Sequence, residues 1–150
     1  MDNLENLLRT LSPVLNPGTY VFVQAGHNLS VDLTTVVASV REPEGLSLVM
    51  EESAAASAEL ATTFRCAWIT LTAQSSLSAV GFTTAFASAL SDVGISANVI
   101  AGLHHDHLFV PIEKAAAAMA ALTALSNRSR TYEAGAPSCS NTLSINDTLT

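Results

Sequence analysis

A β-hairpin is predicted by the sequence of residues 94–111, GISANVIAGLHHDHLFVP. Two apolar, β-branched segments at 95–101 and 105–110 flank a short Gly-Leu-His turn, which is the pattern of a tight antiparallel connection. Gly94 stands where a preceding helix would end in the left-handed conformation. Pro111 would end the second strand and suits the start of a helix. The stretch therefore predicts helix, strand, turn, strand and helix in that order.

One more strand precedes these elements, at residues 64–72. Its side chains alternate between two faces, one carrying Arg65, Ala67, Ile69 and Leu71, and the other Phe64, Cys66, Trp68 and Thr70. Apolar residues recur at helical spacing from Phe82 to Val93 and from Ile112 to Leu122. Because a strand–helix–strand crossover is right-handed, the order predicts the βαββα part of a ferredoxin-like split fold with an antiparallel hairpin. The N-terminal half is expected either to supply the missing fourth strand or to form a second, degenerate unit.

The first 62 residues contain the elements for such a half. Leu4, Leu7, Leu8 and Leu11 recur at spacings of three and four and predict a helix over residues 3–11. Strands are predicted at 19–25, 35–41 and 46–51, the last two joined by a Pro- and Gly-containing turn. An Ala-rich helix is expected at 53–60, and Thr62-Thr63 is a plausible junction between the halves.

Three segments resemble the ACT domain family, whose members are small regulatory modules that often bind amino acids. They are REPEGLSLV at 41–49, SLSAVGF at 76–82 and the hairpin at 94–111. The resemblance covers roughly residues 4–125 and is to small stand-alone proteins with two ACT-like halves. It implies an α+β fold of two fused ferredoxin-like units with antiparallel sheet. We expect an N-terminal ACT-like half at 1–62, an ACT domain at 63–126, and a disordered Ser/Thr-rich tail at 127–150.

The composition excludes several classes of protein. Hydrophobic residues make up 49% and charged residues only 13%, so part of the surface should be buried in a partner, and a homo-oligomer is expected. The net charge is −7 and the six basic residues are scattered, which disfavours nucleic-acid binding. No apolar run approaches the roughly 20 residues that span a bilayer, so no membrane partner is expected. Two distant cysteines form neither a metal spacing nor a disulfide framework, and a reduced, cytoplasmic protein is predicted.

The first candidate site is the turn before the long helix. A helix N-terminus attracts a carboxylate, and the resemblance implies capture of an amino acid there, facing the strand of a neighbouring unit. The predicted ligand-binding residues are Gln74, Ser75, Ser76, Leu77, Asn98 and His105. The alternative is that Ser75 or Ser76 only caps the helix.

The second candidate is the histidine cluster at the hairpin. His105 and His107 point to the same side of a strand, and two imidazoles could ligate a metal if a third ligand, such as His27, came from elsewhere. The spacing is not a zinc signature. An interface or a hydrogen-bonded turn is the simpler interpretation, and no metal or cofactor is predicted.

The third candidate is the sheet face away from the helices. If Ile69, Leu71, Val99, Leu108 and Val110 face the helices, the opposite face is too apolar to be fully solvated. That face carries Trp68, Ile100, His105, His107 and Phe109. It is expected to pack against the other half or another chain, with a ligand groove as the alternative.

Catalysis finds little support in the sequence. Cys66 lies mid-strand as a packed thiol, there is no Gly-x-Ser-x-Gly elbow, and no phosphate-binding glycine loop occurs. The sequence predicts a regulatory protein, not an enzyme, with a small amino acid or related metabolite as its partner. The alternatives are a structural oligomerisation module without a ligand and, third, a metal-dependent enzyme using the histidine hairpin.

Overall fold

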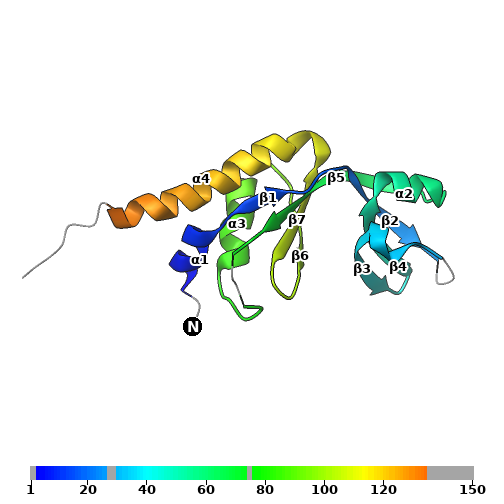
Figure 1. Cartoon of the computed structure of the whole chain (residues 1–150), viewed down its shortest axis with the longest axis horizontal. Helices are drawn as coiled ribbons and strands as arrows, with labels where there is room; N and C mark the ends of the chain where they lie inside the picture. The colour runs from blue at the N-terminus through cyan, green and yellow to red at the C-terminus, as the bar shows by residue number, and fades with distance from the viewer. Residues whose placement is uncertain (1–2, 27–29, 74–75, 135–150) are drawn as a thin grey trace, which may run out of the picture.

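The computed structural model describes residues 3–26, 30–73 and 76–134 of the chain (Figure 1). Most of its strands join one antiparallel sheet in the order β3-β4-β2-β5-β7-β6, and β1 pairs with β5 beside this path. The elements are α1 (Leu4–Thr10), β1 (Pro13–Leu15), β2 (Tyr20–Ala25), η1 (Leu33–Thr35), β3 (Val36–Glu42), β4 (Gly45–Glu51), α2 (Glu52–Ser57), β5 (Thr62–Leu71), α3 (Phe82–Ser91), β6 (Asn98–Ala101), β7 (Asp106–Pro111), η2 (Ile112–Lys114) and α4 (Ala115–Ala134).

The C-terminal unit consists of β5, α3, β6, β7 and α4, with α1 and β1 added to it. The predicted hairpin is confirmed: β6 and β7 are antiparallel, Asn98 pairs with Phe109, and the Gly102 N–H donates to the His105 carbonyl at 2.8 Å. β5 runs antiparallel to β7 on one side and to β1 on the other. The resulting strand order β1-β5-β7-β6 is that of a complete ferredoxin-like sheet. Its fourth strand, β1, comes from the N-terminal half, as one of the two predicted alternatives had it, although no strand was predicted at residues 13–15.

The N-terminal unit has the order β3-β4-β2-β5, which is the same ferredoxin-like arrangement. Its strands β3 and β4 form the predicted hairpin, and α2 follows as expected. A loop ending in η1 joins β2 to β3 where the first helix of such a unit would lie. β5 is therefore shared: it is the fourth strand of this unit and the first strand of the next. The division of the chain between residues 62 and 63 stays a prediction, because β5 crosses it.

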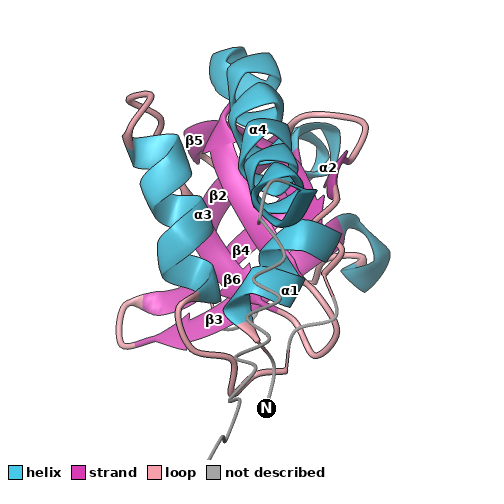
Figure 2. Cartoon of the chain, turned by 90° about the vertical axis from the view of Figure 1, so that its left-hand side faces the viewer, coloured by secondary structure: helices cyan, strands magenta, loops and turns pink. Residues whose placement is uncertain are grey.

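Three helices cover one face of the C-terminal unit. Figure 2 shows α1, α3 and α4 together on the same side of the strands. The largest apolar cluster lies between these helices and the sheet, and it includes Phe86, Leu90 and Leu122 from the helices. Ile69, Leu71, Leu108 and Val110 face it from the strands, as their alternation predicts. Among the described residues, no helix combines the length and apolarity that crossing a membrane would require.

The start of α3 differs from the prediction. The helix begins at Phe82, behind Gly81 at φ 88°, and no side chain in the described part of the chain caps it. A cap at Ser76 is therefore wrong; the Ser76 and Ser78 hydroxyls lie 3.0 Å apart instead. The apolar periodicity that buries the helix starts only at Phe82, and a Cβ on Gly81 would lie 3.1 Å from Leu4 of α1. The left-handed glycine lets the turn pass close to α1.

The other strand and helix ends shift by a few residues. β6 begins at Asn98, because Ile95 is buried in the core from the loop before it. Gly94 has the predicted left-handed conformation, with φ 71°. α4 continues to Ala134, so a tail beginning at residue 127 is wrong for its first eight residues. Residues 135–150 lie outside the described residues.

Candidate functional site

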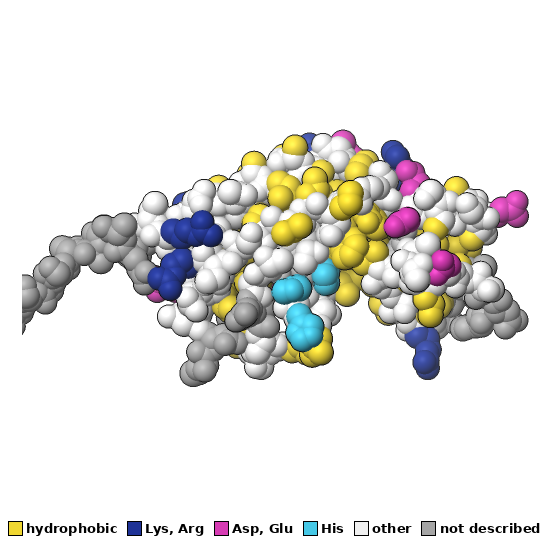
Figure 3. Space-filling model, viewed as in Figure 1, with side chains coloured by type: hydrophobic (Ala, Val, Ile, Leu, Met, Phe, Trp, Pro, Cys, Tyr) yellow, Lys and Arg dark blue, Asp and Glu magenta, His cyan; other side chains and the backbone are white. Residues whose placement is uncertain are grey.

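A cavity of about 230 Å³ lies between the two units, and we call it the inter-unit cleft. Figure 3 shows hydrophobic side chains gathered at the notch between the two parts of the molecule, with the hairpin histidines nearby. The cleft is lined by Tyr20, Thr34, Thr35, Val36, Val37, Ala38, Glu51, Trp68, Ile100, His107 and Phe109. Its floor is the helix-free face of β5, β6 and β7, which was predicted to be covered.

The floor is aromatic and held by hydrogen bonds. The Trp68 indole N–H donates to Nδ1 of His107 at 3.0 Å, and the Thr70 hydroxyl lies 3.2 Å from the same nitrogen. Asn16 donates its side-chain N–H to Thr70 Oγ1 at 2.9 Å. Phe109 is fully buried and stacks beside Trp68, with the planes 19° apart. This network orients Trp68 and His107 before any ligand arrives.

The pKa of His107 is lowered from its ordinary value. Burial of the imidazole is the main cause, and the nearby His105 adds to it, while Asp106 opposes both. An indole N–H can only donate, so Nδ1 of His107 must carry no proton in this arrangement. The low pKa and the hydrogen bond both favour the neutral imidazole.

The facing wall comes from η1 and the start of β3. Val36, Val37 and Ala38 all line the cleft, although successive residues of a regular strand face opposite sides. A bulge explains this: Val36 pairs with Met50 and Ala38 with Val49, so Val37 is an extra residue.

Two threonines extend this wall. The Thr34 hydroxyl donates to the Asp32 carboxylate at 2.7 Å, and the Thr35 hydroxyl donates to the Asp32 carbonyl at 2.7 Å. Because each hydroxyl uses its proton in one of these bonds, its oxygen can only accept a hydrogen bond from any further group. The bonds from Thr34 also lower the pKa of Asp32.

Glu51 is the formally charged residue of the described lining. It pairs across β2 and β4 with Tyr20, whose hydroxyl donates to the Pro17 carbonyl at 3.0 Å. Burial raises the pKa of Tyr20, and the negative charge of Glu51 adds to this. Tyr20 meets Trp68 edge to face, with ring centroids 5.3 Å apart.

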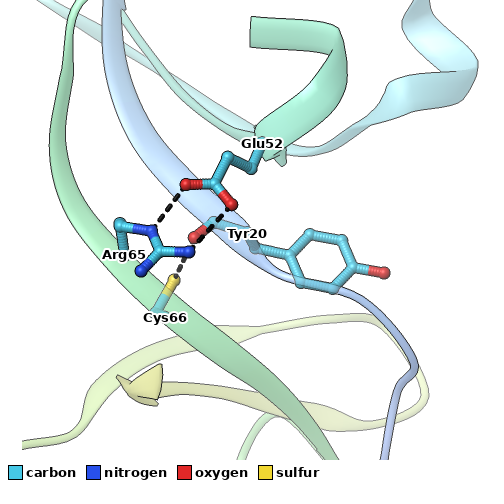
Figure 4. A network of polar contacts seen from close by, with 4 residues as sticks. All are labelled: Tyr20, Glu52, Arg65 and Cys66. Carbon is cyan, nitrogen blue, oxygen red and sulfur yellow. Dashed lines mark hydrogen bonds and ion pairs between the residues drawn. The ribbon is translucent and has the colours of Figure 1, made fainter. Parts of the chain in front are cut away.

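The shared strand is anchored just outside the cleft (Figure 4). Arg65 and Glu52 form a two-pronged ion pair between β5 and α2, at 2.5 and 3.1 Å. The pair raises the pKa of Arg65 and lowers that of Glu52. The Cys66 thiol donates to the Tyr20 carbonyl at 3.4 Å, and burial raises its pKa to about 12. Cys66 is a packed thiol, as expected, and not a nucleophile.

The structure separates the residues predicted to bind a ligand. Ser76 and Leu77 line a smaller cavity of about 80 Å³, which we call the turn pocket. Its remaining described lining is Ala79, Phe82, Thr83, Ala101, Gly102 and Asp106. Asn98 and His105 do not line it: the Asn98 amide donates to the Phe109 carbonyl at 3.5 Å, and Nδ1 of His105 is buried without a hydrogen bond. Gln74 and Ser75 lie outside the described residues.

Among the described residues, the structure brings no third metal ligand to His105 and His107. β7 begins at Asp106, so His105 belongs to the turn, while His107 faces the inter-unit cleft. Across the described parts of the chain, no group of three or more His, Cys, Asp or Glu side chains could hold a metal ion. His27 lies outside those parts.

Sequence reasoning found one wall of the inter-unit cleft and missed the other. Five residues were expected on one face: Trp68, Ile100, His105, His107 and Phe109. All of them line the cleft except His105, which belongs to the turn. Thr34, Thr35 and Glu51 were not expected, because their position depends on how the N-terminal hairpin folds over that face. The only local signal was the interruption of the β3 pattern at its start.

Comparison with known proteins identifies the family. ACT domain models match residues 1–67 and 63–124. A crystal structure of a protein of unknown function from Vibrio cholerae, described as a possible transport protein, is 48% identical, with a TM-score of 0.74; the match covers 82% of this chain and 95% of that one. No curated protein matches the chain.

More distant structures share the fold. The ligand-free regulatory subunit of aspartate kinase from Thermus thermophilus is 12% identical with a TM-score of 0.57, and the match covers 75% of this chain and 95% of that one. An Agrobacterium tumefaciens protein is 17% identical with a TM-score of 0.56, over 77% and 89% of the two chains. The two matched segments overlap at residues 63–67, inside the shared strand β5. This chain belongs to the ACT domain family of regulatory ligand-binding modules and carries two ACT-like units in succession.

Proposed function

We propose that this protein is a ligand-responsive regulatory module that binds a small amino acid at the turn pocket. Its fold is shared with the regulatory subunit of an aspartate kinase. It is also shared with one third of the E. coli aspartokinase III chain, an enzyme that has been solved with aspartate and ADP. The chain itself contributes the chemistry of the turn pocket. That chemistry supports an amino acid over other small metabolites.

The turn pocket offers complementary partners to a zwitterion. Phe82 and Thr83 are the first residues of α3 and line the pocket, and no side chain of the described residues caps this helix. A helix N-terminus favours a carboxylate through its first N–H groups and its partial positive charge. Asp106 lines the same pocket and can attract an ammonium group. The single observation that carries the proposal is this pairing of a helix N-terminus with a carboxylate across one small pocket.

A second copy of the chain completes the site in this proposal. The turn pocket is far smaller than the roughly 300–1,000 Å³ of typical small-molecule sites. It adjoins Ala101 of β6, the edge strand of the sheet, where another unit can be added. Leu77, Val80 and Leu103 are 68%, 87% and 73% exposed nearby, which is costly unless a partner covers them. The ligand would thus bridge two chains and stabilise their association.

A thermal-shift screen of the twenty amino acids tests the function. A ligand at 100 times its Kd should add about 2.7 kcal/mol of stability. In Asp106→Asn, the shift given by the best amino acid should be strongly reduced. Asp92→Asn is the matched control, because Asp92 is exposed at the opposite end of α3. The proposal fails if no amino acid shifts the transition, or if both variants respond equally.

A structural self-association module is the second candidate. The exposed apolar residues and the edge strand β6 also support an oligomer that needs no ligand. Sedimentation with and without the best screening hit separates the two functions. If no amino acid changes the molecular mass of the sedimenting species, the structural module is favoured. If the mass depends on the ligand, the regulatory function is favoured.

A further inference from the structure

We propose that the inter-unit cleft is a second binding site, separate from the turn pocket, and that it takes a small organic cation with an apolar body. A primary amine carried on an aromatic or branched aliphatic group fits this description. The site is independent of the proposed amino-acid site, because the two cavities share no lining residue among those that the structure describes.

The size and walls of the inter-unit cleft set the body of the ligand. At about 230 Å³ it lies just below the usual range for small-molecule sites. Trp68, Phe109 and Ile100 form an apolar floor, and Val36 to Ala38 form the facing wall. The bulge at Val37 brings three consecutive β3 residues to this wall. A flat or branched apolar group of a few carbon atoms can fill the space and displace water from these surfaces.

The polar groups of the inter-unit cleft set the charge of the ligand. Glu51 brings a negative charge, and no Lys or Arg belongs to the described lining. The Thr34 and Thr35 hydroxyl protons are used on Asp32, so their oxygens present lone pairs to a ligand. An ammonium group has three donors and no acceptor, which matches these acceptors. The rings of Trp68 and Tyr20 also favour a cation that lies over an aromatic face.

The same chemistry disfavours a free amino acid here. Its carboxylate would meet Glu51 without a basic side chain of the described lining to pair with it. The His107 imidazole is held neutral by burial and by the indole N–H that it accepts. A carboxylate in this partly buried space would be both desolvated and repelled. The turn pocket and the inter-unit cleft therefore select different ligands.

Titration of Trp68 fluorescence tests the inference, since this is the only tryptophan of the chain and it lines the site. The probe is 2-phenylethylamine, and the matched ligands are 3-phenylpropionate and phenylalanine, which carry the same ring. We expect a saturable change in emission with the amine and none with the two carboxylates. The Kd of 2-phenylethylamine should rise with salt concentration, because salt screens the attraction between its ammonium group and Glu51.

Three variants assign the signal to the inter-unit cleft. Glu51→Gln should raise the Kd for 2-phenylethylamine about fivefold, the effect of losing one partly exposed ion pair. Glu44→Gln is the control, because Glu44 is an exposed carboxylate in the β3–β4 turn. Ala38→Leu should abolish the change by filling the cavity; if circular dichroism shows that this variant misfolds, the Glu51→Gln result decides.

The outcomes separate this inference from the amino-acid site. Equal binding of 3-phenylpropionate or phenylalanine, an unchanged Kd in Glu51→Gln, or no saturable signal would overturn it. Asp92→Asn should leave the Kd of the amine unchanged, since Asp92 is exposed and lines neither cavity. If no amino acid shifts the thermal transition while 2-phenylethylamine binds, the proposed amino-acid function is refuted and the inference about the inter-unit cleft stands.

Discussion

The Trp68 indole and the His107 imidazole are joined by a hydrogen bond of 3.0 Å from Nε1 to Nδ1, across the paired strands β5 and β7. The bond requires Nδ1 without a proton, because the indole nitrogen cannot accept. It links the single tryptophan of the chain to the protonation state of one histidine on the floor of the inter-unit cleft.

The free energy of unfolding should therefore depend on His107 at mildly acidic pH. The fold lowers the pKa of His107, so the unfolded state, with a value of about 6.5, takes up the proton first as the pH falls. Stability should be lost as the pH drops from above 6.5 through the lower folded pKa.

Urea unfolding at pH 8 and pH 5 measures this loss. His107→Asn should lose less stability between these two pH values than the wild type, because the side chain no longer titrates. His104→Asn is the control, since His104 is exposed. An equal loss in the wild type and His107→Asn would contradict the assignment.

Cys66 should resist thiol reagents while the protein is folded. Its thiol is buried, donates to the Tyr20 carbonyl, and has a pKa raised to about 12. In a Cys139→Ser background, reaction with a chromogenic disulfide at pH 8 should release almost no colour until urea is added. Rapid reaction in buffer alone would show that β5 opens far more readily than this packing implies.

Gly102 should not tolerate a side chain. A Cβ there would lie 2.8 Å from the His105 carbonyl oxygen and 3.1 Å from Nε2 of His107. Gly102→Ala should cost about 1–3 kcal/mol, the usual effect of overpacking, and should change Trp68 emission by moving His107. Gly26→Ala is the matched control, because a Cβ there would contact nothing within 4 Å. Denaturant titration followed by Trp68 fluorescence reports both effects, and equal behaviour of the two variants would contradict the geometry.

Phe86 should be among the most costly core residues to truncate. It is fully buried under α3 and meets Phe82 edge to face at 5.3 Å. Phe86→Ala should destabilise the protein by about 3–5 kcal/mol. Val93→Ala, at an exposed position beyond the end of the same helix, should stay within about 0.5 kcal/mol of the wild type. Thermal and urea unfolding compare the two, and similar losses would mean that α3 does not pack as described.

Much of the C-terminal unit could be predicted from local patterns. Alternation along β5 separates Ile69 and Leu71, which face the helices, from Cys66 and Trp68, which face the other way. The Gly-containing turn at 102–104 and the left-handed Gly94 followed from turn and cap chemistry. These signals are local, because side-chain period and backbone conformation are properties of a few adjacent residues.

The start of α3 could not be predicted from cap chemistry alone. Ser76 has the residue type of a cap, but the burial of Phe82 and the approach of Gly81 to Leu4 on α1 decide where the helix begins. Tertiary contacts of this kind override local preference. The predicted ligand set failed to come together for the same reason: Asn98 lies in the edge strand β6, whereas Ser76 lies in the loop before α3 and lines the turn pocket.

The sequence alone thus determined which face of each strand is apolar. The tertiary structure decided which element covers that face. An apolar face must be buried, but periodicity does not name its partner. In the tertiary structure β1 comes from the N-terminus to pair with β5, and the bulged start of β3 comes to face Trp68 and Phe109. Both contacts join residues 30 or more positions apart, so their energy depends on the whole packed arrangement and not on any local run of sequence.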